Sequence, residues 1–258
     1  MRLHVVIEGS GPRVALLHPV GLSGAFLAPL AQSLASRFSV MRIDLRGHGH
    51  SALDPLASSM AEFADDVHET LQWHRFAPCA VAGFSFGSMT AQELAIRHPE
   101  SVSALLALAG PCTFSDALRP VLAQRGTDAL AHGMGAVIDA TMARWFTPAF
   151  RHSPVALATR RYLLESDPRG WAQGWHAISR LDTESRLRVL RMPALCVAGS
   201  NDVSSTPQDV QRISAAIPGA VYREIAGAPH MLFIEQPAAT FDVVQGFLQG
   251  LAGAHTPR

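Results

Sequence analysis

The chain of 258 residues is 48% hydrophobic, which is enough for one full-sized core with an elaborate insertion. It carries 21 basic and 21 acidic residues, so the balance gives no basic footprint for a nucleic acid or an anionic membrane. Every basic residue is arginine. The absence of lysine excludes Schiff-base chemistry and the phosphate-binding lysine of a P-loop.

Three cysteines, Cys79, Cys112 and Cys196, lie in or beside apolar segments, and their odd number and long spacings do not make a disulfide framework. We expect buried free thiols in a reducing compartment. The first residues hold an apolar stretch too short for a signal peptide, and no segment approaches roughly 18 uninterrupted apolar residues. These features predict a soluble cytoplasmic protein with no membrane or nucleic-acid partner.

Short apolar runs recur along the chain, each followed by turn residues and a stretch of helical period. Strands that alternate with helices of this length predict a mostly parallel, doubly wound α/β sheet, built from right-handed crossovers and covered on both faces. The strands are predicted at 14–18, 38–44, 78–83, 103–110, 193–199 and 220–225, and the helices at 23–38, 60–74, 86–98, 207–217 and 238–251.

Residues 113–191 interrupt this alternation with helical periodicity and no convincing strand. The segment holds three of the four tryptophans, Trp145, Trp171 and Trp175, and its eleven arginines and seven acidic residues give it a net positive charge. Tryptophans of this kind often serve only to pack a segment together or against a core. We predict an all-helical lid at 113–191, inserted in an α/β core that comprises residues 1–112 and 192–258.

Ser85 lies between Gly83 and Gly87, where the apolar strand 78–83 runs directly into the helix 86–98. A turn this tight holds the serine in a strained backbone conformation with its hydroxyl above the sheet. Glycines on either side remove side chains that would collide where strand and helix converge. The pattern is G-x-S-x-G, the nucleophile elbow, in the strand–turn–helix setting that it requires. We predict that Ser85 is a catalytic nucleophile.

A serine hydroxyl needs a base to take its proton, and the base needs a carboxylate that fixes its tautomer and stabilises the imidazolium. In this architecture the order along the chain is serine, acid, histidine, each on a loop at the carboxyl end of a strand. Asp202 follows the strand 193–199, and His230 follows the last strand. Because Asp209 lies inside the next helix, we predict a catalytic triad of Ser85, Asp202 and His230.

Charge that develops on a carbonyl oxygen must meet preoriented donors, which form an oxyanion hole. The backbone N–H of Phe86, at the start of the helix after the nucleophile, is one predicted donor. Val20, in the loop that follows the first strand, is the other, and Gly21 gives this loop the freedom to turn inward. His18 precedes them and is predicted to be a structural residue bonded to the backbone.

A metal site is not predicted. His48 and His50 form an H-x-H pair, but no third ligand stands near them. His68 and Glu69 begin an H-E pair that lacks the second histidine of a metalloprotease helix.

With these features together, the chain resembles the α/β-hydrolase fold superfamily over essentially its whole length. The loop HPVG at 18–21 is similar to the family's H-G-x-G oxyanion loop, apart from its proline. DLRGHGHS at 44–51 matches the family's D-x-R-G-x-G-x-S pattern, and GFSFGS and the two later triad loops complete the set. The resemblance implies ester hydrolysis through an acyl-enzyme on Ser85, with no metal or organic cofactor.

The lid segment resembles that of 3-oxoadipate enol-lactonases in its stretches at 143–157 and 165–182, which run into the strand and acid loop at 191–207. In that family the R-W-F-T element belongs to the lid over the substrate pocket. The resemblance therefore implies a small carboxylated lactone or ester as substrate, with Arg144 and Trp145 as substrate-binding residues. Arginine presents a planar fork suited to gripping a carboxylate.

Other functions are compatible with the same triad. A general carboxylesterase or a hydrolase of C–C bonds would use it unchanged, and only the lid and pocket separate these enzymes. A ligand receptor on a hydrolase scaffold is a possibility of another class. Ser88 replaces a glycine that the lactonase elbow usually has, so the exact lactone stays open, and the sequence does not specify an oligomeric state.

Overall fold

The computed structural model describes residues 1–54 and 59–254, and within them a sheet of seven strands has the order β1-β3-β2-β4-β5-β6-β7. β1 runs antiparallel to β3, and every other neighbouring pair is parallel. The mostly parallel sheet is therefore confirmed. Residues 255–258, at the end of the predicted core, lie outside the described residues. The strands are β1 (Val5–Glu8), β2 (Arg13–Leu17), β3 (Ser39–Ile43), β4 (Cys79–Phe84), β5 (Val102–Leu108), β6 (Ala194–Gly199) and β7 (Val221–Ile225).

The edge strand β1 is the one strand that the sequence did not predict. It has only four residues, and it pairs with β3 alone, with Val5 opposite Ile43. Two of its apolar side chains, Val6 and Ile7, are exposed. The apolar run of this strand is only three residues long, which is too short to predict a strand from its pattern alone.

The strands at the centre of the sheet are apolar throughout because both of their faces are covered. All six residues of β4 and of β6 are buried, and six of the seven in β5. Continuous apolar runs of this kind are typical of parallel strands between two layers of helices. They form a rigid base for the loops at their carboxyl ends.

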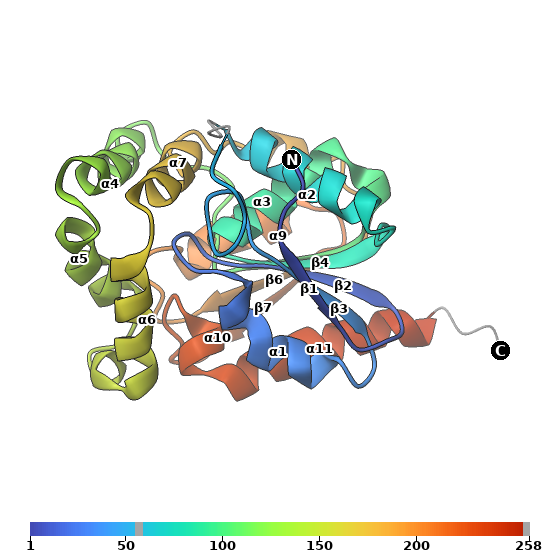
Figure 1. Ribbon diagram of the computed structural model, residues 1–258. Coiled ribbons are helices and arrows are strands. Elements are labelled where there is room, and N and C mark those ends of the chain that lie inside the picture. Colours follow the sequence, from blue (N-terminus) through green and yellow to red (C-terminus); the bar gives the residue numbers. More distant parts are fainter. Residues whose placement is uncertain (55–58, 255–258) are drawn as a thin grey trace.

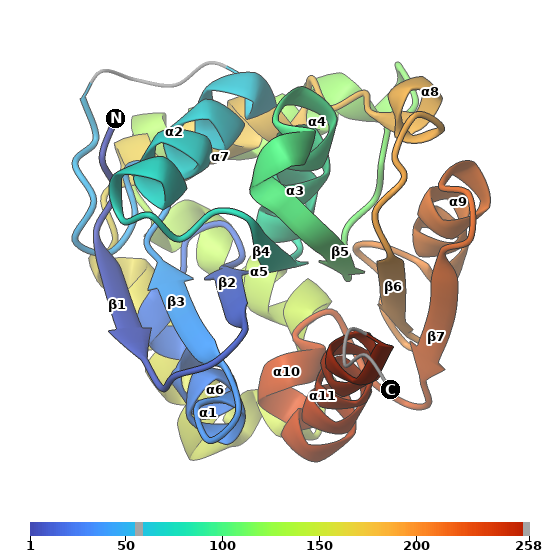
Figure 2. The same cartoon turned by 90° about the vertical axis from the view of Figure 1, so that its right-hand side faces the viewer.

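Helices cover both faces of the sheet (Figures 1 and 2). Apolar side chains recur at helical spacing in these helices, as in α2, where the buried ones include Met60, Phe63 and Val67. On one face lie α1 (Ala28–Leu34) and α11 (Pro237–Ala254), and on the other α2 (Met60–Trp73), α3 (Phe86–Arg97) and α9 (Pro207–Ala216). Short elements are α10 (Leu232–Glu235) and the 3₁₀ turns Gly24–Leu27, Pro99–Ser101 and Phe150–His152.

The chain between β5 and β6 is helical and has no strand. Figure 1 shows its longer helices gathered at one end of the sheet. Ser153 and Asp167 cap two of them with their side chains, each followed by a proline at the first helical position. The boundaries of the lid at 113–191 stay a prediction. The helices here are α4 (Leu118–His132), α5 (Gly135–Trp145), α6 (Pro154–Glu165), α7 (Pro168–Ile178) and the short α8 (Glu184–Leu187).

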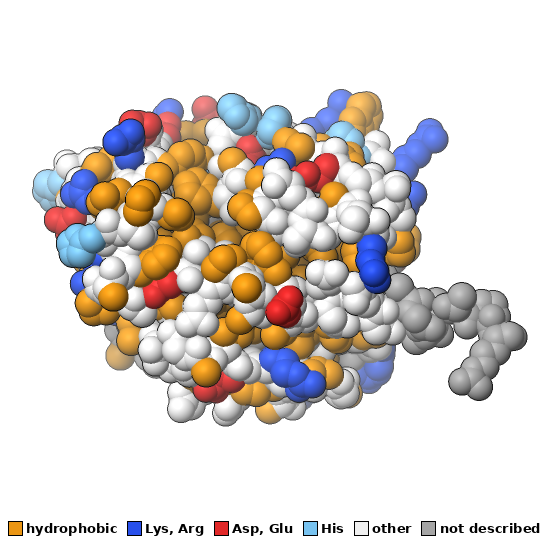
Figure 3. Space-filling view, turned by 90° about the horizontal axis from the view of Figure 1, so that it is seen from below, with side chains coloured by type: hydrophobic (Ala, Val, Ile, Leu, Met, Phe, Trp, Pro, Cys, Tyr) orange, Lys and Arg blue, Asp and Glu red, His pale blue; other side chains and the backbone are white. Residues whose placement is uncertain are grey.

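The surface seen in Figure 3 is covered largely by hydrophobic and uncharged side chains. Its few charged side chains are scattered, and the blue ones are arginines because the chain has no lysine. This face therefore presents no continuous basic surface. Across residues 1–54 and 59–254, no helix has the length and apolar character needed to cross a membrane.

Candidate active site

Ser85 occupies a sharp turn between β4 and α3, and its backbone angles are φ 53° and ψ −112°. A residue other than glycine rarely adopts such a positive φ, so the surrounding structure must hold Ser85 in this conformation. Gly83 and Gly87 must be glycines because a Cβ at either position would clash with a backbone carbonyl. A Cβ on Gly83 would lie 2.1 Å from the carbonyl oxygen of Gly87, and a Cβ on Gly87 would lie 2.3 Å from that of Leu17.

We expect Gly83→Ala to lower the free energy of unfolding by about 1–3 kcal/mol or more, because overpacking a rigid site forces the backbone to shift. The measurement is urea unfolding. Gly246→Ala in α11 is the control, since a Cβ there meets nothing within 4 Å, and a helical alanine is favoured over glycine by up to about 1 kcal/mol. Equal stability of Gly83→Ala and the wild type would contradict the close approach at the elbow.

The three predicted triad residues lie in one hydrogen-bonded line. His230 Nε2 is 2.9 Å from Ser85 Oγ, and His230 Nδ1 is 2.8 Å from Asp202 Oδ2. The side chains come from the loops that follow β4, β6 and β7, whose carboxyl ends meet at one edge of the sheet. Ser85 is 6%, Asp202 3% and His230 4% exposed, so water is largely excluded from the line.

The second oxygen of Asp202 fixes the orientation of the carboxylate. Oδ1 accepts hydrogen bonds from the backbone N–H groups of Ser204, at 2.7 Å, and Ser205, at 2.9 Å. Because a carboxylate only accepts, the proton of His230 must stand on Nδ1, which leaves a lone pair on Nε2 toward the hydroxyl of Ser85. Asp209 is elsewhere: it closes a capping box with Thr206 at the start of α9.

The two predicted oxyanion donors are near the serine. Phe86 is the first residue of α3, and Val20 lines the same cavity as Ser85. Among the residues that the structure describes, neither backbone N–H has an acceptor. Gly21 has φ 77°, and a Cβ there would lie 2.7 Å from the ring of Trp171, so the loop after β2 turns tightly against the lid.

His18 supports this loop through hydrogen bonds to the backbone. Its Nδ1 donates to the carbonyl of Pro19 at 2.8 Å, and its Nε2 accepts from the backbone N–H of Leu45 at 2.9 Å. Burial lowers the pKa of this imidazole, so it stays neutral. These bonds to the backbone agree with the structural role predicted for His18.

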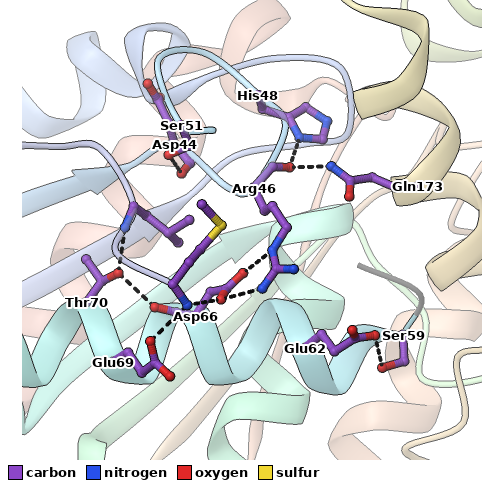
Figure 4. Close-up of polar contacts among 12 residues, drawn as sticks. Asp44, Arg46, His48, Ser51, Ser59, Glu62, Asp66, Glu69, Thr70 and Gln173 are labelled. Carbon is purple, nitrogen blue, oxygen red and sulfur yellow. Dashed lines mark hydrogen bonds and ion pairs between the residues drawn. The ribbon is translucent and has the colours of Figure 1, made fainter. Parts of the chain in front are cut away.

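The loop 44–51 joins the core to the lid (Figure 4). Arg46 forms a buried ion pair with Asp66 of α2, with both N···O distances at 2.6 Å. The carbonyl of Arg46 accepts from Gln173 of α7 at 3.0 Å and from His48 Nδ1 at 2.9 Å. Burial lowers the pKa of His48 to about 3. The predicted D-x-R-G-x-G-x-S pattern thus builds a rigid support on which α7 rests.

A small cavity lies over Ser85. Its volume is about 40 Å³, far below the roughly 300–1,000 Å³ of most ligand pockets, so a substrate must displace lid side chains to enter. Most of the cover comes from α4, α5 and α7. The lining comprises Val20, Ser85, Met89, Phe114, Leu122, Arg125, Arg144, Trp145, Trp175, Ile178, Ser204, Ser205 and His230.

The predicted substrate-binding residues occupy different depths of this cavity. Trp145 is 3% exposed, and its ring centroid is 6.4 Å from that of His230. Arg144 is exposed at the edge, where its Nη2 donates to the carbonyl of Val203 at 2.8 Å. Sequence reasoning missed Arg125 and did not single out Trp175 for this cavity. No motif contains Arg125, so no sequence signal could have found it.

Comparisons with known proteins show which family the chain belongs to. A family model described as the alpha/beta hydrolase fold matches residues 12–237. The pimeloyl-[acyl-carrier protein] methyl ester esterase of Chromobacterium violaceum is 30% identical to this chain, over 98% of the chain and 97% of the esterase. The 3-oxoadipate enol-lactonase 1 of Acinetobacter baylyi is 24% identical, over 96% and 94% of the two chains.

A solved structure is similar over nearly the whole chain. The enol-lactonase from Burkholderia xenovorans LB400 superposes with a TM-score of 0.90 at 30% identity, and the match covers 96% of both chains. The motifs, the fold and these likenesses agree. This chain belongs to the α/β hydrolase fold family.

Proposed function

We propose that this protein is a serine hydrolase that opens a small carboxylated lactone, or cleaves a similar ester, through an acyl-enzyme on Ser85. The observation that carries the proposal is the hydrogen-bonded line Ser85–His230–Asp202 under a lid-covered cavity. Enol-lactonases among its relatives support the choice of substrate.

The reaction follows from the positions of the protons. Ser85 Oγ bonds to the carbonyl carbon while its proton passes to His230 Nε2. The bond between that carbon and the ring oxygen then breaks, and His230 donates the proton to the released oxygen. The acyl group is left on Ser85.

Hydrolysis of the acyl-enzyme repeats these steps with water. A water molecule gives a proton to His230 Nε2 and attacks the acyl carbon, and His230 returns the proton to Ser85 Oγ as the acid leaves. In both halves the N–H groups of Val20 and Phe86 donate to the oxyanion. Asp202 stabilises the imidazolium of His230 and remains a carboxylate.

A second candidate is hydrolysis of a methyl ester on an acyl chain, because a methyl ester esterase of carrier-protein substrates is 30% identical to this chain. A substrate tethered to a carrier protein needs a path from the serine to the surface. Arg125 and Arg144 in the lining of the cavity favour a substrate with a free carboxylate.

The test is a substrate panel of 3-oxoadipate enol-lactone, its neutral carboxamide, pimeloyl-[acyl-carrier protein] methyl ester and p-nitrophenyl acetate. We expect the highest kcat/KM on the carboxylated lactone. A higher value on the carrier-protein ester would favour the second candidate. Turnover of the aryl ester without any turnover of the lactone would leave a general esterase, and one stoichiometric burst without turnover would indicate a receptor.

Arg144 at the edge of the cavity gives a further prediction. Removing a charged donor to an anion costs about 1.5–3 kcal/mol, and exposure places Arg144 near the lower figure. We expect Arg144→Ala to lower kcat/KM for the carboxylated lactone about tenfold and to leave p-nitrophenyl acetate nearly unaffected. Equal losses on both substrates would show that the change only loosens the lid.

A further inference from the structure

Arg125 reaches the cavity over Ser85 from α4, the lid helix that lies beside α7 (Figure 1). The side chain is half-buried, and its guanidinium carbon lies 4.1 Å from the ring centroid of Trp175, which comes from α7. Its Nη2 donates to Thr141 Oγ1 of α5 at 2.9 Å. Three lid helices therefore hold this guanidinium in one orientation.

Two residues that line this cavity each have a buried N–H group with no hydrogen-bond acceptor among the described residues. Neither Arg125 Nε nor Trp175 Nε1 is accessible to solvent, and neither has a hydrogen-bond acceptor within the described part of the chain. Both residues line the cavity that also contains Ser85 and His230. Buried N–H groups in folded proteins are nearly always paired, and leaving one unpaired is costly. Acceptor atoms of a bound ligand could satisfy these N–H groups.

The cavity also lacks a negative charge. None of the described residues that line it is acidic, and the carboxylate of Asp202 beside it is engaged by His230 and two backbone N–H groups. Burial and the nearby Arg144 lower the pKa of Arg125 to about 10, so it remains charged at pH 7. The site therefore holds a partly buried cation that contacts an aromatic ring but has no carboxylate partner among the described residues.

Some other lid arginines form ion pairs with acidic side chains. Arg160 pairs with Asp139 at 3.1 Å, Arg169 with Asp167 at 2.7 Å, and Arg186 with Glu93 at 2.7 Å. No such ion pair joins Arg125 to a carboxylate of the described residues. Arg144, Arg161, Arg188 and Arg191 likewise have no ion pair with a described residue, but their side chains are exposed. Arg125 is distinguished from these four by its half-buried position in the cavity over Ser85.

We propose that Arg125 and Trp175 form an anion subsite that binds the free carboxylate of the substrate while its lactone or ester carbonyl lies at Ser85. The proposal of this subsite rests on the proposed function. Within that function, Arg125 and Trp175 would be the residues that select a carboxylated substrate. A carboxylate oxygen would give both buried N–H groups an acceptor and would neutralise the guanidinium, and the water-poor setting strengthens such a pair. Arg144 then acts as an outer charge at the edge of the same site.

The test uses Arg125→Met, which keeps an apolar side chain over Trp175 but has no donor and no charge. We expect kcat/KM for 3-oxoadipate enol-lactone to fall about 10- to 150-fold, with kcat/KM for its carboxamide and for p-nitrophenyl acetate nearly unchanged. Arg160→Met is the matched control, because it removes the same charge from the lid surface and should leave all three values at the wild-type level.

A second measurement does not depend on the lactone. Succinate should inhibit the hydrolysis of p-nitrophenyl acetate competitively, succinamide should not, and Arg125→Met should weaken the inhibition by succinate by a similar factor. If the wild type does not hydrolyse the lactone but succinate inhibits the hydrolysis of p-nitrophenyl acetate as described, the proposed lactone function is wrong and the subsite is still supported. Equal losses on charged and neutral substrates, or inhibition by succinate that Arg125→Met leaves unchanged, would overturn the subsite.

Discussion

Ser85→Ala is expected to lower kcat for an ester by a factor on the order of 10⁴–10⁶, and to abolish the acyl-enzyme. The change removes the hydroxyl oxygen that lies 2.9 Å from His230 Nε2. Alanine keeps the Cβ that the turn at φ 53° already accommodates, so the fold should persist. Steady-state turnover of p-nitrophenyl acetate and a thermal unfolding curve measure the two effects.

Ser88→Ala provides the control for this experiment. Ser88 is a buried serine of α3, three residues further along. The hydrogen bonds of His230 within the described residues go to Asp202 and Ser85 instead. It should retain turnover near the wild-type rate. Turnover by Ser85→Ala at a rate comparable to that of Ser88→Ala would exclude the proposed nucleophile.

Asp202→Asn is expected to lower kcat by a factor on the order of 10⁴ with little change in the fold. The backbone N–H groups of Ser204 and Ser205 require an acceptor, so the amide oxygen of asparagine will stay on them. The amide nitrogen must then face His230 Nδ1 and donate to it. This shifts the imidazole proton from Nδ1 to Nε2. Nε2 then has no lone pair with which to accept the proton of Ser85.

Asp209→Asn separates this effect from a general loss of an acidic residue. Asp209 accepts from the backbone N–H and hydroxyl of Thr206 at the start of α9, away from the triad. Its replacement can weaken a helix cap but should leave kcat near the wild-type value. The opposite pattern of losses would show that the acid has been assigned to the wrong residue.

Local sequence patterns predicted the parts of the site that lie at strand ends. The elbow is contained in six consecutive residues, and its glycines are required by contacts inside the turn itself. Asp202 and His230 are far apart in the sequence, but parallel strands bring their carboxyl ends to one edge of the sheet, so chain order alone located them.

The depth of the lid residues could not be predicted in this way. Arg144 and Trp145 are neighbours in the sequence, yet one is exposed and the other buried. The depth of each depends on how α5 packs against α4 and α6, two other helices of the lid. Arg125 acquires its surroundings from Trp175, fifty residues later, when α4 packs on α7. Single-sequence patterns carry no record of such a contact between two lid helices.

The claim that Ser85 is the nucleophile is tested most directly by covalent labelling with diethyl p-nitrophenyl phosphate. Its phosphorus accepts a bond from an activated serine oxygen, and p-nitrophenolate leaves. We predict one diethyl phosphoryl group per chain by intact mass spectrometry, located by peptide mapping to Ser85, with esterase activity lost in proportion to labelling and no label on Ser85→Ala. Loss of activity with Ser85 unmodified, or complete labelling of Ser85 with activity retained, would contradict the proposed mechanism.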